Sequence, residues 1–336
     1  KLSKNISRVT SMTGPRIKEL IITPIAITDP PLLNSVGIHS PYALRTVIEL
    51  VTEDNISGIS EIPGNINIDD LLKQAESLVI GADPFQLNSL KSRLFEKFGN
   101  QEADVRGDNP WDDRKLIHVY SALEVACLDI QGKVCNRPVV DLLGGKCRDH
   151  ITFAAYLFYK TKGAGGTYGY DIDPNATGWA KARQAAAETP EEIVAQAHAM
   201  CKEFGFESIK LKGGVFPPEE EVAAMLALSE AFGSDVPLRF DPNGVWTVDT
   251  SIKCGQQMEH ILEYLEDPTR GQEGMAAVRK ALNIPLATNM CTTSFENIPS
   301  SIALGSEDII LSDHHFWGGL RASVELGKIC ETFGKG

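Results

Sequence analysis

The spacing of apolar residues divides the chain into two parts. Between residues 16 and 62, apolar and polar residues alternate in the runs "IKELIITPIAI" and "RTVIELVTEDNISGISEIPG", which predicts strands of an antiparallel sheet. The loop "TDPPLLNSVGIHSPY" lies between them. Over 66–98 and 113–143 the apolar period becomes helical, and one stripe of the second segment consists of Val119, Ala122, Leu123, Ala126, Cys127 and Ile130. We therefore expect an α+β domain over residues 1–150.

After residue 150, short apolar runs alternate with helical segments. The runs are "TFAAYLFY", "ESIKLK", "VPLRFD", "ILEYLE", "IPLAT" and "DIILSD". One intervening helix is expected over 190–204, with Thr189 as N-cap, Pro190 in the first helical position and Glu192 completing a capping box. This alternation predicts a parallel sheet over residues 151–336, either open and doubly wound or an incomplete barrel.

Glycine residues gather in one segment of this second part. The stretch "KGAGGTYG" lacks the lysine and hydroxyl pattern of a phosphate-binding loop, and no GxGxxG motif opens a helix. We expect residues 161–188 to form a flexible loop without a chemical role.

Composition excludes several classes of protein. The 336 residues are 43% hydrophobic and 23% charged, as in soluble globular proteins, and the net charge of -13 without a basic stripe argues against nucleic acid as a partner. Seven scattered cysteines without a CxxC pair favour reduced thiols over a disulfide framework or a zinc site. Neither an apolar signal segment nor a stretch long enough to span a bilayer occurs, so we expect a cytoplasmic protein without a membrane partner.

Polar residues stand at the carboxyl ends of four successive apolar runs. They are Asp241 in "RFDPN", Glu266 in "YLEDP", Asn289 in "LATNM" and Asp313 in "LSDHH". The carboxyl ends of parallel strands meet at one edge of the sheet, where sites are assembled. Carboxylate and amide oxygens suit Mg²⁺, with Mn²⁺ as the alternative. Taken singly, each acidic residue before a proline also fits a turn or a helix cap.

Two lysines occupy one face of the expected strand in "IKLKGG". Side chains alternate along a strand, so Lys210 and Lys212 point the same way. Facing each other and a divalent cation, both ammonium groups should have depressed pKa values, which would leave one as a base near neutral pH. A solvated strand face is the structural alternative. Beside a ring of metal ligands, the pair predicts a proton-abstraction site.

Taken in order, these motifs resemble a known group of enzymes. "IKLKGG", "RFDPNGVW", "YLEDP", "ATNM" and "SDHHFW", following "SALEVACLDIQGK", are similar to the enolase superfamily and, within it, to the glucarate dehydratases of the mandelate racemase type. The similarity runs from "LLNSVGIHSPY" to residue 333. It implies an α+β cap over a modified (β/α)7β barrel of TIM type and a lyase of aldaric acid catabolism that acts on a dicarboxylate sugar acid.

The resemblance also implies roles for individual residues. Asp241, Glu266 and Asn289 would bind magnesium. Lys212 would remove the proton next to a substrate carboxylate, and Lys210 would hold that carboxylate and depress the pKa of Lys212. The positions that match the family's substrate pocket, or a place beside it, are His39, Tyr156, Phe158, Asn243 and His315.

Departures from the family pattern leave alternatives open. Asp313 matches an aspartate that orients a histidine on the seventh barrel strand, which would fall beyond residue 336. His314 stands where relatives carry proline, and the segment "GDNPWDDR" around Pro110 lacks a threonine that relatives use to bind substrate. We expect residues 1–336 alone to be poorly active, with any activity favouring the epimer whose proton faces Lys212. The alternatives are another aldarate dehydratase, a racemase or epimerase, or a non-catalytic truncated paralogue that acts by association with an intact subunit. A homo-oligomer is compatible with each of them.

Overall fold

The first part of the chain is a three-stranded antiparallel sheet covered by helices. The computed structural model describes residues 14–102, 112–162 and 169–336; Pro110 and most of the "KGAGGTYG" stretch fall outside these ranges. The sheet order is β1-β4-β5, formed by β1 (Ile17–Thr28), β4 (Tyr42–Thr52) and β5 (Ser57–Pro63). Between β1 and β4 lies a small hairpin of β2 (Leu33–Asn34) and β3 (Gly37–Ile38).

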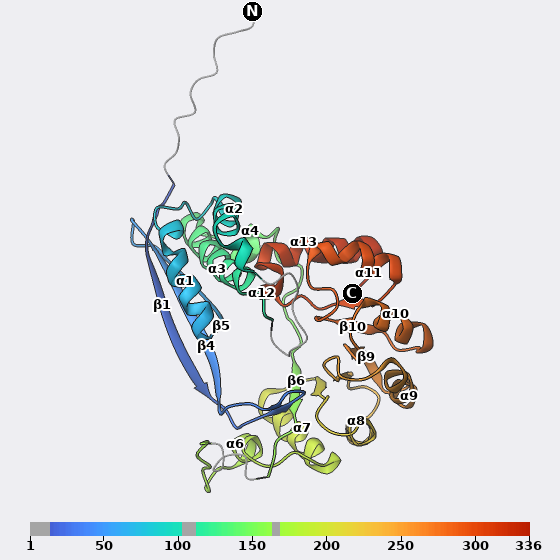
Figure 1. Ribbon diagram of the computed structural model, residues 1–336. Coiled ribbons are helices and arrows are strands. Elements are labelled where there is room, and N and C mark those ends of the chain that lie inside the picture. The colour runs from blue at the N-terminus through green and yellow to red at the C-terminus, as the bar shows by residue number, and fades with distance from the viewer. Residues whose placement is uncertain (1–13, 103–111, 163–168) are drawn as a thin grey trace, which may run out of the picture.

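Helices bury one face of this sheet (Figure 1). They are α1 (Ile66–Val79), α2 (Leu87–Phe98), the 3-10 turn η1 (Gly99–Gln101), α3 (Lys115–Cys135) and α4 (Val139–Leu142). Asn65 begins α1 by accepting hydrogen bonds from two backbone N–H groups, and Asn136 ends α3 in the left-handed conformation. The expected apolar stripe of α3 is buried throughout, as the helical period predicted.

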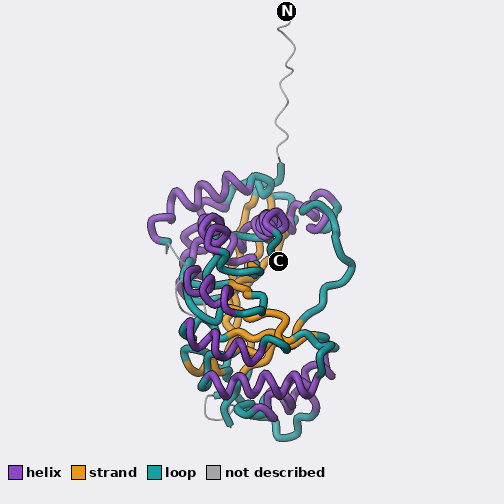
Figure 2. Tube along the Cα trace, turned by 90° about the vertical axis from the view of Figure 1, so that its right-hand side faces the viewer, coloured by secondary structure: helices purple, strands orange, loops and turns teal. Residues whose placement is uncertain are grey.

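The second part is a six-stranded parallel sheet with the order β11-β10-β9-β8-β7-β6. Its strands are β6 (Ala154–Phe158), β7 (Ser208–Lys212), β8 (Leu238–Asp241), β9 (Leu262–Glu266), β10 (Leu286–Thr288) and β11 (Ile309–Ile310). Each lies within one of the six apolar runs, so the predicted strand and helix alternation is confirmed. Figure 2 shows the strands in orange running inside the molecule, with purple helices outside them.

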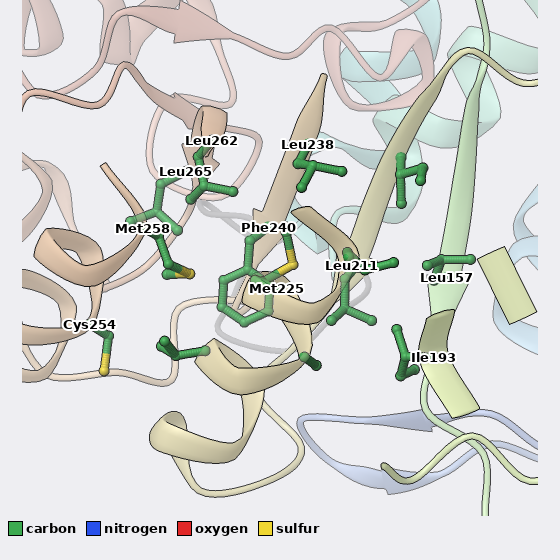
Figure 3. Packing of buried hydrophobic residues seen from close by; sticks show 14 of the residues in the cluster. Leu157, Ile193, Leu211, Met225, Leu238, Phe240, Cys254, Met258, Leu262 and Leu265 are labelled. Atoms are coloured by element: carbon green, nitrogen blue, oxygen red, sulfur yellow. The ribbon is translucent and has the colours of Figure 1, made fainter. Parts of the chain in front are cut away.

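Helices follow the strands. They are α6 (Gly178–Arg183), α7 (Pro190–Phe204), α8 (Pro218–Phe232), α9 (Val248–Met258), α10 (Gln272–Ala281), the 3-10 turn η2 (Phe295–Asn297), α11 (Ile298–Leu304), α12 (His314–Trp317) and α13 (Leu320–Phe333). The core of the sheet includes side chains of α7, α8, α9 and α10, whereas α11, α12 and α13 pack with Ile310 of β11 in a separate apolar cluster. Figure 3 shows Leu211 and Phe240 of the sheet packed with Met225 of α8. Burying side chains of this size stabilises the fold by about 1.5–3 kcal/mol each.

A local sequence signal begins α7, and contacts with the first domain hold α6. The capping box that opens α7 is present: the Thr189 hydroxyl accepts from the backbone N–H of Glu192, and the Glu192 carboxylate accepts from that of Thr189. The expectation that 161–188 is entirely a loop is wrong, because α6 occupies part of it. Arg183 at the end of α6 donates to Asp29 and to the carbonyl oxygen of Thr28, so this helix is tied to the first domain.

The two parts of the chain meet where α3 packs against α12 and α13 (Figure 1). The buried Glu124 carboxylate of α3 accepts from the backbone N–H groups of Leu320 and Arg321, each at 3.1 Å, and thereby caps α13. Gly319 is required here, because a Cβ would lie 2.4 Å from the Glu124 side chain and φ is +112°. This joint fixes α12, which follows β11, against the first domain.

Two further expectations concern cysteines and membranes. All seven cysteines are free thiols, as their scattered positions predicted. Among the described residues, no helix is both long and apolar enough to cross a bilayer. The domain boundary near residue 150 stays a prediction.

Candidate active site

The predicted polar residues lie at one edge of the parallel sheet. Asp241 and Glu266 are the last residues of β8 and β9, and Asn289 directly follows β10. The strand register pairs Lys212 with Asp241 and Ala287 with Glu266, which brings these ends side by side. Parallel strands end at the same edge of their sheet, so the residues at their carboxyl ends are aligned.

A cavity of about 540 Å³ opens at this edge between the two domains. Among the residues predicted from the sequence, its lining includes His39, Tyr156, Phe158, Lys210, Lys212, Asn243, Asn289, Asp313 and His315. Asp241 and Glu266 lie directly beneath it, each in contact with one or both lysines. Residues from seven distinct segments of sequence are thus gathered around one space.

Two lysines and two carboxylates form the charged floor of the cavity. Lys212 Nζ donates to Asp241 Oδ2 at 2.7 Å and also contacts the Asn243 amide oxygen. Lys210 Nζ lies 3.3 Å from the same Asp241 oxygen and donates to Glu266 Oε2. Asp241 and Glu266 are almost completely buried, with relative exposures of 1% and 0%. Each buried charge therefore has a partner of opposite sign.

The expected depression of the two lysine pKa values is wrong for this arrangement. Burial alone would lower the pKa of Lys210 and Lys212, but the carboxylates of Asp241 and Glu266 outweigh it and raise both above their usual value. Burial likewise opposes ionisation of Asp241, yet Lys212 and Lys210 lower its pKa. Burial and the adjacent Asp241 charge raise the pKa of Glu266. The lysines act here as counter-ions of the carboxylates, so a free amine requires that another cation take over this role.

The donor set fits a hard divalent cation. Glu266 Oε1 is buried without a hydrogen-bond partner among the described residues, which leaves a buried acceptor unsatisfied. Asn289 uses its amide nitrogen to donate to Asp313 Oδ2 at 3.0 Å, so its amide oxygen is the atom available to a cation. No group of three or more His, Cys, Asp or Glu side chains in the described ranges could hold a metal ion. The predicted metal ligands differ from such a group because the third oxygen comes from the Asn289 amide and not from a third His, Cys, Asp or Glu.

In the described part of the chain, no hydrogen bond joins Asp313 to a histidine. The Asp313 carboxylate accepts a hydrogen bond from the Asn289 amide instead. It precedes α12, where the rings of His314 and His315 lie 4.0 Å apart. Burial, followed by the neighbouring His314 and His118, lowers the pKa of His315 to about 3, so this imidazole is neutral. His314 is absent from the residues that line the cavity.

The aromatic and amide residues predicted to contact substrate form the remaining walls. Tyr156 and Phe158 project from the same face of β6, with ring centroids 4.6 Å apart, and Lys210 Nζ lies 4.9 Å from the centre of the Tyr156 ring. Asn243 has a left-handed backbone, φ 59°, and donates to the Ser35 hydroxyl at 3.1 Å. His39 contacts Asn34, and burial lowers its pKa. The β2–β3 hairpin of the first domain thus contributes to the site at the edge of the parallel sheet.

Three residues that the sequence analysis did not select support this site. Glu221, at the start of α8, is fully buried and accepts from the backbone N–H groups of three residues after Lys212, namely Gly214, Val215 and Phe216. Asp267 accepts from the backbone N–H of Asn289 at 2.9 Å. His118 of α3 lines the cavity. Asp267 lay within the quoted "YLEDP" motif, whereas no local signal marks Glu221 or His118.

Comparisons with known proteins agree with this arrangement. Residues 18–144 match the mandelate racemase/muconate lactonizing enzyme N-terminal domain, and residues 192–336 match the enolase C-terminal domain-like family. A protein of Streptomyces coelicolor named probable glucarate dehydratase is 43% identical over 325 residues, which are 94% of this chain and 72% of that protein. The L-talarate/galactarate dehydratase of Salmonella typhimurium is 24% identical over 98% of this chain and 77% of its own length.

Solved structures show the same fold. A Thermobispora bispora enolase complexed with magnesium and formate is 44% identical, with a TM-score of 0.87 over 95% of this chain and 74% of its own. A Mycobacterium smegmatis enolase complexed with tartrate is 46% identical, with a TM-score of 0.85 over 96% of this chain and 74% of its own. The family models, these identities and the two-part fold together show that the chain belongs to the mandelate racemase/muconate lactonizing enzyme family of the enolase superfamily.

Proposed function

We propose that this protein is a magnesium-dependent dehydratase of an acyclic sugar diacid of the D-glucarate or L-idarate type. The observation that carries the proposal is the group of Lys210, Lys212, Asp241 and Glu266, buried at the strand ends on the floor of a cavity. The 43% identity to a probable glucarate dehydratase supports the substrate class.

The metal would be held by Asp241, Glu266 and Asn289, whose oxygens suit magnesium. When bound, magnesium supplies positive charge that stabilises a dianion developing on a carboxylate and competes with the lysines for the two carboxylates. Lys210, placed between the carboxylates and Tyr156, would then bind the substrate carboxylate. Its charge next to Lys212 favours the neutral amine of the latter.

Lys212 would act as the base. Its amine takes the proton from the carbon next to the substrate carboxylate, and the electron pair of the broken C–H bond moves into an enediolate. The electron pair of the enediolate then forms a carbon–carbon double bond as the bond from the neighbouring carbon to its hydroxyl group breaks, and the hydroxyl takes a proton from solvent and leaves as water. The resulting enol tautomerises to a 5-keto-4-deoxy aldarate. Asn243, which contacts Lys212, would orient the amine toward the substrate.

A panel of sugar diacids tests this function. D-glucarate, L-idarate and galactarate are incubated with the protein and MgCl₂ in D₂O, and ¹H NMR follows both keto-acid formation and loss of the proton next to the carboxylate. We expect keto acid from glucarate or idarate, with idarate favoured if Lys212 is the sole base. Deuterium incorporation without keto acid would indicate a racemase or epimerase, and no exchange with any diacid would overturn the proposal.

A further inference from the structure

Lys160 is a buried lysine outside the charged floor of the cavity. It lies shortly after β6, and only 2% of its surface is exposed. Lysine is seldom buried in this way, because its ammonium group loses contact with water. The proposed chemistry has no use for this side chain, so its burial calls for another role.

The side chain of Lys160 links β6 to the end of α6. Its Nζ atom donates to the carbonyl oxygens of Ala182 at 3.0 Å and Arg183 at 2.8 Å. The carboxyl end of a helix carries partial negative charge, so a cation is stabilising there. The centre of the Trp179 ring, on the same helix, lies 6.0 Å from Nζ. The chain after the helix is held separately, by backbone hydrogen bonds between Lys160 and Ala187.

In turn, α6 holds the segment of the first domain that leads into the β2–β3 hairpin (Figure 1). Arg183 donates from Nε to Asp29 Oδ1 at 3.0 Å and from Nη2 to the carbonyl oxygen of Thr28 at 2.7 Å. At the start of the hairpin, the backbone N–H of Leu33 donates to the carbonyl oxygen of Tyr159 at 2.9 Å. The hairpin is thus attached both to α6 and to the residue that precedes Lys160.

This hairpin forms part of the cavity. Asn34 and His39 line it. The Ser35 hydroxyl accepts from the side chain of Asn243, which also contacts Lys212. A displaced hairpin would therefore alter the cavity wall and the amide next to the proposed base.

We propose that Lys160 is a positioning residue of the cavity: its ammonium fastens α6 to β6, and α6 in turn keeps the β2–β3 hairpin in place. This inference goes beyond the proposed function, because it concerns the shape of the cavity and not the reaction performed there.

Protonation of Lys160 gives this attachment a pH dependence. Burial lowers the pKa of Lys160 to about 8, an effect that the Asp29 charge opposes and the Arg183 charge reinforces. When α6 detaches, the amine reaches water and its pKa returns to about 10.4. The detached form therefore binds more protons between about pH 8 and 10.4, so detachment becomes rarer as the pH rises, by up to about tenfold per pH unit.

Hydrogen exchange followed by mass spectrometry tests the attachment without any ligand. The unmodified protein is compared with Lys160→Met and with Lys181→Met, because Lys181 is also on α6 but is exposed. Lys160→Met should raise exchange by about tenfold in 178–187, since hydrogen bonds from a charged donor are lost. Exchange in 28–39 should rise by at least about threefold, a smaller factor because the bond from Leu33 remains. Peptides from α3 should be unchanged, and Lys181→Met should match the unmodified protein throughout.

Trypsin cleavage supplies a pH profile that a merely structural lysine would not produce. The peptide bond after Arg183 contains a carbonyl group that Lys160 binds, so cleavage requires release of the ammonium. A synthetic peptide of residues 178–187 corrects for the pH dependence of trypsin itself. The corrected rate for the unmodified protein should fall by about tenfold between about pH 8 and 9.5, whereas that for Lys160→Met should stay constant.

The profile of the unmodified protein needs no variant, so it decides the inference even if Lys160→Met does not fold. A corrected cleavage rate that is independent of pH, a rise in exchange across the whole chain, or a rise in 178–187 without one in 28–39 would overturn the inference. Neither measurement involves turnover, so failure to dehydrate any sugar diacid would overturn the proposed function alone.

Discussion

The floor of the cavity and its histidine wall satisfy their polar groups in opposite ways. On the floor, Lys210 and Lys212 are ion-paired with Asp241 and Glu266, and almost every charged atom has a partner. On the wall, the stacked rings of His118 and His315 each retain an unpartnered nitrogen. On the floor the charges neutralise one another, whereas on the wall two buried nitrogen atoms have no hydrogen-bond partner among the described residues.

This difference matters for the proposed chemistry. The ion pairs between lysines and carboxylates on the floor must break before the lysines can bind a substrate carboxylate. The carboxylates are then free to bind a cation, so this region can bind a cation and an anion at the same time. Within the described part of the chain, the wall has no such ion pairs to break, and its two rings are held by stacking on each other. We therefore assign the proposed chemistry to the floor.

The largest effect is expected from the base on the floor. Lys212→Ala should lower kcat/KM for diacid dehydration by roughly 10²- to 10⁴-fold, because proton abstraction loses its acceptor. Keto-acid formation measures the rate. Lys253→Ala, which breaks an exposed ion pair with Glu219, is the matched control and should leave the rate unchanged. A Lys212→Ala variant with undiminished activity would place the base elsewhere.

Removing one floor carboxylate should weaken the metal site. Glu266→Gln is expected to reduce magnesium affinity by at least roughly 10- to 100-fold, since even indirect partners of a metal have effects of this size. Calorimetric titration with MgCl₂ measures it. Glu263→Gln, on the same strand but exposed and paired with Arg239, provides the comparison and should bind magnesium normally. Equal affinity of the two variants would contradict the assignment.

The turn that follows Lys212 should depend on Glu221. Replacing its carboxylate in Glu221→Gln leaves at least one buried backbone N–H without an acceptor, which should lower the free energy of unfolding by about 1–3 kcal/mol. Urea denaturation measures this change. The adjacent exposed residue serves as control, and Glu220→Gln should stay within about 0.5 kcal/mol of the unmodified protein. Similar losses in both variants would rule out a special role for Glu221.

The histidine wall should give the protein a specific dependence on pH. Because the pKa of His315 is lowered to about 3, the unfolded chain binds more protons at this residue than the folded one between about pH 6.5 and 3. The free energy of unfolding should therefore fall as the pH drops through this window, by up to about 1.4 kcal/mol per pH unit from this group.

Chemical denaturation at several pH values, compared with His315→Phe, measures that contribution. The variant should have a flatter profile over the same window, since phenylalanine cannot be protonated. Parallel profiles for the unmodified protein and His315→Phe would show that His315 titrates normally.

Local patterns were sufficient for the strands and for most of the floor. Alternation placed all six parallel strands, and polar residues at their ends predicted where Asp241, Glu266 and Asn289 would meet. Period-two geometry also predicted that Lys210 and Lys212 share one face. Their raised pKa values could not be predicted, because the balance between burial and carboxylate charge depends on distances across three strands.

The pairing of His118 with His315 could not be found from sequence. His118 and His315 stand far apart in the chain, and only the packing of α3 against α12 stacks them. His118 lies on a helix whose apolar stripe predicts burial but not a partner. Glu221 likewise reads as one of several acidic residues in the first turn of α8. Such contacts depend on tertiary structure that no local period encodes.

Diffraction from crystals soaked in MnCl₂ and tartrate would show whether the cation is held as proposed. Manganese replaces magnesium at sites of oxygen ligands and is located by its anomalous signal. We expect one strong peak bound by oxygens of Asp241, Glu266 and Asn289, with Lys212 released from Asp241 and facing the ligand. A peak elsewhere, or an empty site with Lys210 still joining the two carboxylates, would contradict the mechanism.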